Sequence, residues 1–408
     1  MGTAGPALKS ADCWRICEVM KSKKRCWLTG LSLAALCLMV FAAADIWYRA
    51  EKRAACREKT ETVQKIMDRE KEWIRENQGA GGEIYMNLSG GAGDVNPYFA
   101  CQAAMGLLAG QPSAEDLSCA AEYLSWHAEK LAECEGVVTN YRNDGNGLEP
   151  TGEFDSVDSY IAVYLTLLSE YEEKGGRLSE AGDWQEALAV CAEKLEELNP
   201  GGLTQVSEKN QVSYLMDNAE VWEGCHRIRL LLESEDVEVA GWAGAAETGR
   251  RYGLLEEGIW QSVSGKLWNA EEQRFEIGLD GRGRPLDFTG WQEFYPDAIA
   301  QVYPSACGMI LSREQAAELY EKLCSWFEWE SLGLEETFDW PVLACIAVEL
   351  GDEERAESFV KAYEAAYGEN REYPLHTADA GWTARACEAL EESYEETAGR
   401  GILADILN

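Results

Sequence analysis

The sequence predicts an all-α protein in which six buried helices form an inner ring inside six more polar helices. Apolar helical segments alternate with charged ones, and loops rich in Gly, Asn and acids separate them. A helix that is apolar all round is buried, whereas a helix with one apolar stripe faces water. This alternation recurs after roughly fifty residues, which favours closure into an (α/α)6 toroid over an open solenoid. The length of 408 residues, 46% of them hydrophobic, suits one large toroid or two ordinary domains.

The N-terminal part contains an uncharged run, Cys26 to Ala44, that is about as long as a bilayer core requires. Trp27 and Trp47 are placed like interfacial anchors, and the basic residues just before the run keep the N-terminus inside. Further basic residues after the run weaken that orientation. A cleavable signal peptide ending at Ala44 is the alternative, and either interpretation exports the domain. We therefore expect a cytoplasmic N-terminus at 1–25, a transmembrane signal anchor at 26–47 and an extracytoplasmic domain at 48–408, in the cell membrane or secreted if cleaved.

Hydrophobic periodicity predicts twelve helices in two classes. The expected inner helices are Asn96–Leu108, Ser156–Leu168, Val212–Leu232, Pro296–Ile310, Trp340–Leu350 and Ala380–Leu390. The expected outer helices are Glu51–Asn77 and those near Ala114–Cys134, Ala181–Leu198, Val239–Val263, Arg313–Trp329 and Asp352–Tyr367. The segment from Arg274 to Gly283 is typical of a small β-hairpin inserted before the fourth inner helix.

Carboxylates stand at the start of every expected inner helix. Because the inner helices of a toroid run in one direction, their N-termini share one end and form a single mouth. Acids there also cap helices, which explains one acid per helix but less well a second acid three residues on. The acids are Asp94, Glu153, Asp155, Asp158, Asp217, Glu220, Glu293, Asp297, Glu336, Asp339 and Asp379.

Aromatic residues accompany these acids, and flat rings beside carboxylates suit the apolar faces and polar rim of a pyranose. One carboxyl group that keeps its proton and a second that activates water or attacks the anomeric carbon can cleave a glycosidic bond. We expect catalysis from Asp155 or Asp158 with Asp217 or Glu220, and Asp297 as a third candidate. Trp291 and Tyr295 are the favoured sugar platform, while Tyr98 also fits as core. The expected substrate-binding residues are Tyr98, Glu153, Trp291, Tyr295, Trp340, His376 and Trp382.

The motifs around Asn96–Ala100, Glu153–Tyr160, Met216–Trp222 and Phe294–Ala298 resemble the six-hairpin glycosidase superfamily, in particular bacterial members without a settled activity. The resemblance covers roughly residues 61–390 and implies an (α/α)6 fold, a carbohydrate ligand and usually hydrolysis. It assigns no catalytic residue. The expected function is a glycoside hydrolase that acts on an extracellular or cell-envelope polysaccharide or oligosaccharide. A non-catalytic, membrane-anchored carbohydrate-binding protein and a polysaccharide lyase are the alternatives.

Composition excludes several other classes of protein. A net charge of -37 repels phosphate backbones, so nucleic acid is not an expected partner. Three scattered histidines and the absence of metalloprotease, P-loop and serine-hydrolase motifs leave no metal or cofactor to expect. A lyase would need Arg or Lys for a uronate, and the candidates near the mouth are only Arg142, Arg282 and Arg284, with His226 and His376 as bases. Most of the 14 cysteines lie in apolar helical segments, which favours free thiols over disulfides.

Overall fold

The structure, a computed structural model, describes residues 10–234, 236–334 and 338–400. The chain forms two compact units, one with the residues up to Lys59 and those from Tyr394 on, the other Thr60–Ser393. Helix α1 (Ser10–Glu76) begins in the first unit and ends in the second. Within the first unit, the Arg49 guanidinium donates to Asp45 at 2.7 Å and to the carbonyl of Gly399 at 2.8 Å.

The predicted membrane anchor lies within α1. Among the helices that the structure describes, none combines the length and the apolar character needed to span a bilayer. The side chains of residues 24–35, which include the first half of the predicted anchor, lie outside the described part.

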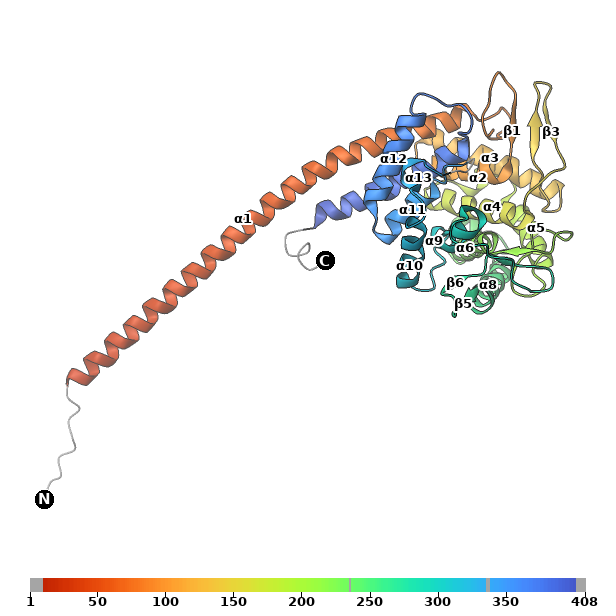
Figure 1. The fold of residues 1–408 in the computed structure, drawn as a ribbon. Coiled ribbons are helices and arrows are strands. Elements are labelled where there is room, and N and C mark those ends of the chain that lie inside the picture. The colour runs from red at the N-terminus through yellow and green to blue at the C-terminus, as the bar shows by residue number, and fades with distance from the viewer. Residues whose placement is uncertain (1–9, 235, 335–337, 401–408) are drawn as a thin grey trace. The chain divides into compact units, whose positions relative to one another are not determined.

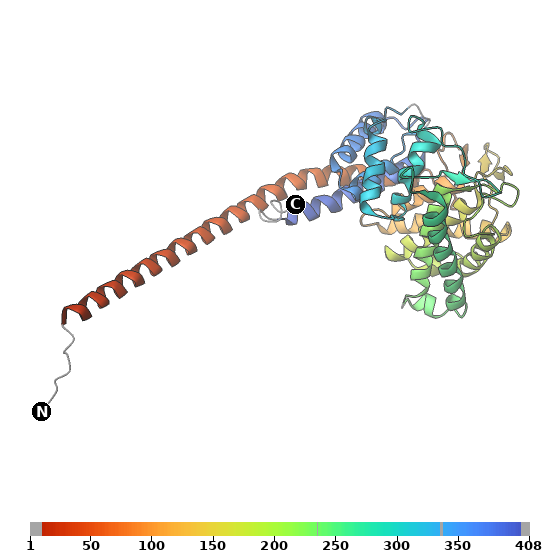
Figure 2. The ribbon, with the colours of Figure 1, turned by 60° about the horizontal axis from the view of Figure 1, so that its bottom comes forward.

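Two classes of helices build the unit Thr60–Ser393, as predicted. The apolar helices are buried on nearly every face, because small residues such as Ala100 and Ala162 let them pack closely. The inner helices are α2 (Pro97–Leu107), α4 (Val157–Glu173), α6 (Leu215–Leu232), α9 (Ile299–Ala306), α11 (Val342–Leu350) and α13 (Thr377–Gly399) (Figure 1). The outer helices are the end of α1, α3 (Ala114–Glu133), α5 (Trp184–Glu197), α8 (Ala245–Ser262), α10 (Arg313–Cys324) and α12 (Glu353–Tyr367), seen from another side in Figure 2.

The inner helices close into a ring. Helix α2 packs on α4, α4 on α6, α6 on α9, and α9 on α11. The thiol of Cys345 in α11 then lies 3.8 Å from the carbonyl of Trp382 in α13. Gly381 in α13 lies so close to Gly106 in α2 that a Cβ on either glycine would overlap the backbone of the other helix. The sixth inner helix therefore packs on the first, which is the closed toroid that the repeat predicts.

The chain turns back at Asp280–Gly283 as predicted, where Leu279 forms an antiparallel bridge with Pro285, but the strands pair in more ways than one hairpin. Strands β5 (Trp268–Asn269) and β6 (Arg274–Phe275) pair with each other, whereas β7 (Gly278–Leu279) pairs with β4 (Ser213–Tyr214), which directly precedes α6. A three-stranded antiparallel sheet was not predicted, and its order is β1 (Gly93–Val95), β2 (Tyr141–Asn143) and β3 (Leu148–Pro150). These strands hold the loops that lead into α2, α4 and α6.

Candidate active site

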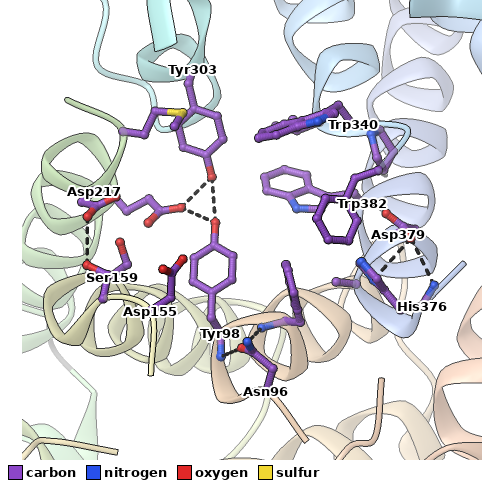
Figure 3. A pocket seen from close by; sticks show the side chains of 18 of the residues that line it. Asn96, Tyr98, Asp155, Ser159, Asp217, Tyr303, Trp340, His376, Asp379 and Trp382 are labelled. Carbon is purple, nitrogen blue, oxygen red and sulfur yellow. Dashed lines mark hydrogen bonds and ion pairs between the residues drawn. The ribbon is translucent and has the colours of Figure 1, made fainter. Parts of the chain in front are cut away.

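A pocket opens where the N-terminal ends of the six inner helices meet. Its volume is about 490 Å³, within the range of small-molecule sites. Each inner helix contributes side chains from its first turns or from the residues just before it (Figure 3). Its lining comprises Asn96, Tyr98, Phe99, Asp155, Ser156, Ser159, Tyr160, Met216, Asp217, Glu220, Tyr295, Tyr303, Phe338, Trp340, Pro341, Val342, His376, Ala378, Asp379 and Trp382.

One wall of the pocket, from α4 and α6, carries three carboxyl groups: those of Asp155, Asp217 and Glu220. The hydroxyl of Ser156 lies 2.8 Å from Asp217 and also contacts Asp158, which is buried behind the wall. Burial raises the pKa of Asp217 well above its usual range, and the charges of Asp158, Glu220 and Asp155 add to the effect. Like charges this close cannot all ionise, so this wall binds protons at neutral pH.

Glu220 is held by two tyrosine hydroxyls. The hydroxyl of Tyr98 donates to Glu220 Oε1 at 2.6 Å, and that of Tyr303 donates to the same oxygen at 2.5 Å. Burial raises the pKa of Glu220 to about 7, and the two hydroxyl contacts act in the opposite direction by stabilising the carboxylate. Glu220 is therefore fixed in position and close to half ionised at neutral pH.

The opposite wall, from α13, carries Asp379 and His376 (Figure 3). The backbone N–H of His376 donates to Asp379 at 3.1 Å, an acid at the third helical position capping its own helix. Burial raises the pKa of Asp379 to about 8 and lowers that of His376 to about 4, so both groups are neutral at pH 7. The imidazole stacks on Phe99 at 4.7 Å and meets the edge of Phe338 at 5.1 Å.

Aromatic rings complete the pocket between the two walls. The ring centroids of Tyr295 and Trp340 are 5.6 Å apart. The guanidinium carbon of Arg385 lies 4.3 Å from the ring centroid of Trp382. Tyr295 is 47% exposed, so its ring is open to a ligand. Trp340 has a positive φ of 51°, a left-handed backbone that is uncommon for a bulky residue and occurs mostly at functional sites.

Eight of the twelve predicted site residues line the pocket, and four do not. Asp158 is fully buried behind Ser156, and Asp297 is buried because the backbone N–H groups of Thr289 and Gly290 bind it. Glu153 is exposed on the loop before α4. Trp291 is buried under the ammonium of Lys322 at 4.4 Å, so the sugar platform expected there belongs to the packing between loop and α10. Glu336 lies outside the described residues.

The sequence did not single out Tyr303, and it gave Asp379 only as one of many helix-start acids. Tyr303 lies in the second turn of α9, beyond the mouth residues, and reaches the pocket because its hydroxyl meets Glu220. Its position four residues beyond Ile299 on an apolar helix is typical of core. His226, a candidate lyase base, lies away from the pocket and binds Glu256 at 2.8 Å. In the described part of the chain no cluster of three or more His, Cys, Asp or Glu could hold a metal ion.

Several glycosidases of known structure share this architecture. A wild-type glycosidase superposes with a TM-score of 0.56 at 12% identity, covering 83% of this chain and 98% of the other. A variant of a glycosidase in complex with glucose gives a TM-score of 0.55, with 12% identity and coverage of 83% and 98%. The chain has the six-hairpin glycosidase fold. No protein-family profile and no curated protein sequence matches the chain.

Proposed function

We propose that the protein is a glycoside hydrolase that binds a sugar ring in the pocket and cleaves its glycosidic bond with two carboxyl groups. One observation carries the proposal: carboxyl groups occupy opposite walls of a sugar-sized pocket, with aromatic rings between them (Figure 3). Acid–base cleavage needs one group on each side of the bond, and the rings suit the apolar faces of a sugar. The glycosidase fold and the glucose complex of a similar structure support this function.

The surroundings of Asp379 and Glu220 indicate which of them is the general acid and which is the base or nucleophile. Asp379 is buried and has one described donor, the backbone N–H of His376, so burial favours its protonated form and it serves as the general acid that protonates the leaving oxygen. Glu220 accepts hydrogen bonds from Tyr98 and Tyr303, which favour its ionised form. It therefore serves as the base that activates water or as the nucleophile. The charge of Glu220 raises the pKa of Asp217, so Asp217 holds a proton while Glu220 is ionised.

Leaving-group dependence tests these roles. Dinitrophenyl glycosides need no acid, whereas methyl glycosides do. We expect D379N to lose about 10²- to 10⁴-fold in kcat/KM on methyl glycosides and far less on dinitrophenyl glycosides of the same sugar. E220Q should lose activity on both. In E220A, where the shortened side chain leaves space for an anion, azide should restore turnover of the dinitrophenyl glycosides.

The exposed residues Asp144 and Glu149, outside the pocket, supply matched controls. D144N and E149Q should retain wild-type kinetics on both glycosides. The opposite pattern, with E220Q alone dependent on the leaving group, would reverse the two roles. If the wild-type protein released no reducing ends from a broad glycan panel, the non-catalytic sugar-binding alternative would stand instead.

The lyase alternative has little support. Among the described lining residues of the pocket there is no Lys or Arg to bind a uronate carboxylate. Arg142 is paired with Asp94 at 2.7 Å and Arg284 with Asp280 at 2.5 Å.

Export of the domain remains a proposal from the sequence. The uncharged run from Cys26 to Ala44, with basic residues before it, is the supporting observation. We propose a carbohydrate of the cell surface or its surroundings as substrate. Protease added to intact cells should degrade the domain if it is displayed outside, and fractionation should place it with membranes if the run is not cleaved.

A further inference from the structure

The pocket contains more carboxyl groups than hydrolysis requires. Two suffice for cleavage, yet Asp155, Asp217, Glu220 and Asp379 all line the pocket, and no Lys or Arg does among the described lining residues. Three of the four have partners: Asp217 accepts from Ser156, Glu220 from two tyrosines, and Asp379 from the backbone of His376.

Asp155 is the fourth of these carboxyl groups, the one without a partner among the described residues. Its carboxylate is exposed at the pocket and has no hydrogen bond or ion pair with any described residue. The ring of Tyr295 is close enough that, after burial, the charge of Asp155 is the largest influence raising the pKa of this tyrosine. An anion beside an open aromatic face is an arrangement that binds a cation, by charge and by the ring's negative face.

A second, independent feature points to a ligand in the same pocket. His376 is only 6% exposed, and among the described residues neither of its ring nitrogens has a hydrogen-bond partner. Nδ1 is 3.3 Å from Asp379 without hydrogen-bond geometry, and Nε2 makes no hydrogen bond with the part of the chain that the structure describes. Buried polar atoms are seldom left unpaired, so a bound hydroxyl group is the expected partner. A sugar that reaches His376 on one wall also reaches the acidic wall on the other.

We propose that the sugar in this pocket is an amino sugar, whose ammonium group lies between the Asp155 carboxylate and the ring of Tyr295 while a hydroxyl group meets His376. This inference rests on the proposed function and names the substrate class of the same site. A neutral sugar would leave the Asp155 carboxylate without a counter-charge. A uronic acid would bring a second negative charge next to it.

Binding of a cation should also release protons. Asp155, Asp158, Asp217 and Glu220 repel one another across the acidic wall. Tyr98, Tyr160, Tyr214, Tyr295 and Tyr303 also face this wall, and Asp379 and His376 lie opposite it. Burial, and after it this repulsion, raises the pKa of Asp217 and Glu220 and so favours their protonated forms. An ammonium group offsets the repulsion, so a carboxyl group ionises as the amino sugar binds.

Calorimetric titration of the purified full-length chain with glucosamine, glucose and glucuronate tests the inference. At about pH 6 the amine is charged, since it lies below the usual range of amine pKa values. We expect glucosamine to bind on the order of tenfold more tightly than glucose, with glucuronate weakest. Repeating the titration in buffers of different ionisation enthalpy should show proton release with glucosamine but not with glucose.

The variant D155N should lose most of the preference for glucosamine while its affinity for glucose changes little. D144N removes the same charge outside the pocket and should keep the preference. Equal or weaker binding of glucosamine, no detectable binding of it, or a preference that survives D155N would overturn the inference. These ratios need no turnover, so they stand if hydrolysis is not found, and hydrolysis of neutral glycosides alone would refute only the amino sugar.

Discussion

At the residue scale, Trp340 shows strain stored at the pocket wall. Its φ of 51° is left-handed, where a Cβ costs about 1–2 kcal/mol. We therefore predict that W340G is more stable than W340A by about 1 kcal/mol, the reverse of the usual order, because only glycine relieves the strain. Urea unfolding gives the free energy of unfolding of each variant. Both variants lack the indole ring, so its loss cancels in the difference between them.

Trp382 provides the matched comparison, since it also lines the pocket but lies inside α13. There the order should be the ordinary one, with W382A more stable than W382G by about 1 kcal/mol. If glycine were the weaker residue at both positions, the backbone of Trp340 would not be under strain.

At the element scale, closure of the ring depends on the close approach of α2 and α13 at Gly106 and Gly381. A methyl group at Gly381 would overlap the backbone of Gln102 and Ala103, which cannot move aside as a side chain could. We predict that G381A lowers the free energy of unfolding by about 1–3 kcal/mol. G258A, in α8, should instead raise it by up to about 1 kcal/mol, because nothing lies closer than 4.0 Å to the new Cβ. A neutral G381A would mean that the two helices can separate at no cost.

Helices were predictable in this chain and strands were not, for a physical reason. An inner helix such as α4 buries nearly every side chain, and that apolar run is visible in the sequence. Strands such as β4 and β7 are two residues long and are defined by pairing between segments over sixty residues apart. No local pattern of two residues encodes such a partner, so the turn at Asp280–Gly283 was predicted but the pairing of β7 with β4 was not.

For the whole molecule, the repeat predicted which ends of the helices form the mouth, but not which acids face it. Asp155 lines the pocket from the loop before α4, whereas Asp158 lies buried in the first turn of that helix. Helix α4 packs on α2 and α6 and is buried at Asp158, while the extended backbone of Ser156 leaves Asp155 outside the helix. Asp297 was lost to the site for a similar reason, because loop N–H groups from Thr289 and Gly290 surround it. Long-range packing, not local sequence, decides such cases.

A site built from protonated acids should also make the stability of the whole molecule depend on pH. Burial raises the pKa of Asp379 to about 8, far above the value of about 3.9 in an unfolded chain. A raised carboxyl pKa means that the folded state holds its proton longer, so the stability it contributes at low pH is lost between roughly pH 4 and pH 8. His376, with its pKa lowered to about 4, acts in the opposite sense, because its contribution to stability is lost as the pH falls.

D379N keeps the shape of the side chain and has no proton to lose. We therefore predict that D379N gains stability over wild type as the pH rises, by on the order of a few kcal/mol between pH 5 and pH 8.5. Urea unfolding of both proteins at the two pH values gives the double difference, in which the effect of His376 largely cancels. D144N, which removes an exposed charge, corrects for the change in net charge. A D379N advantage that is the same at both pH values would show that Asp379 ionises freely in the folded protein and cannot serve as its general acid.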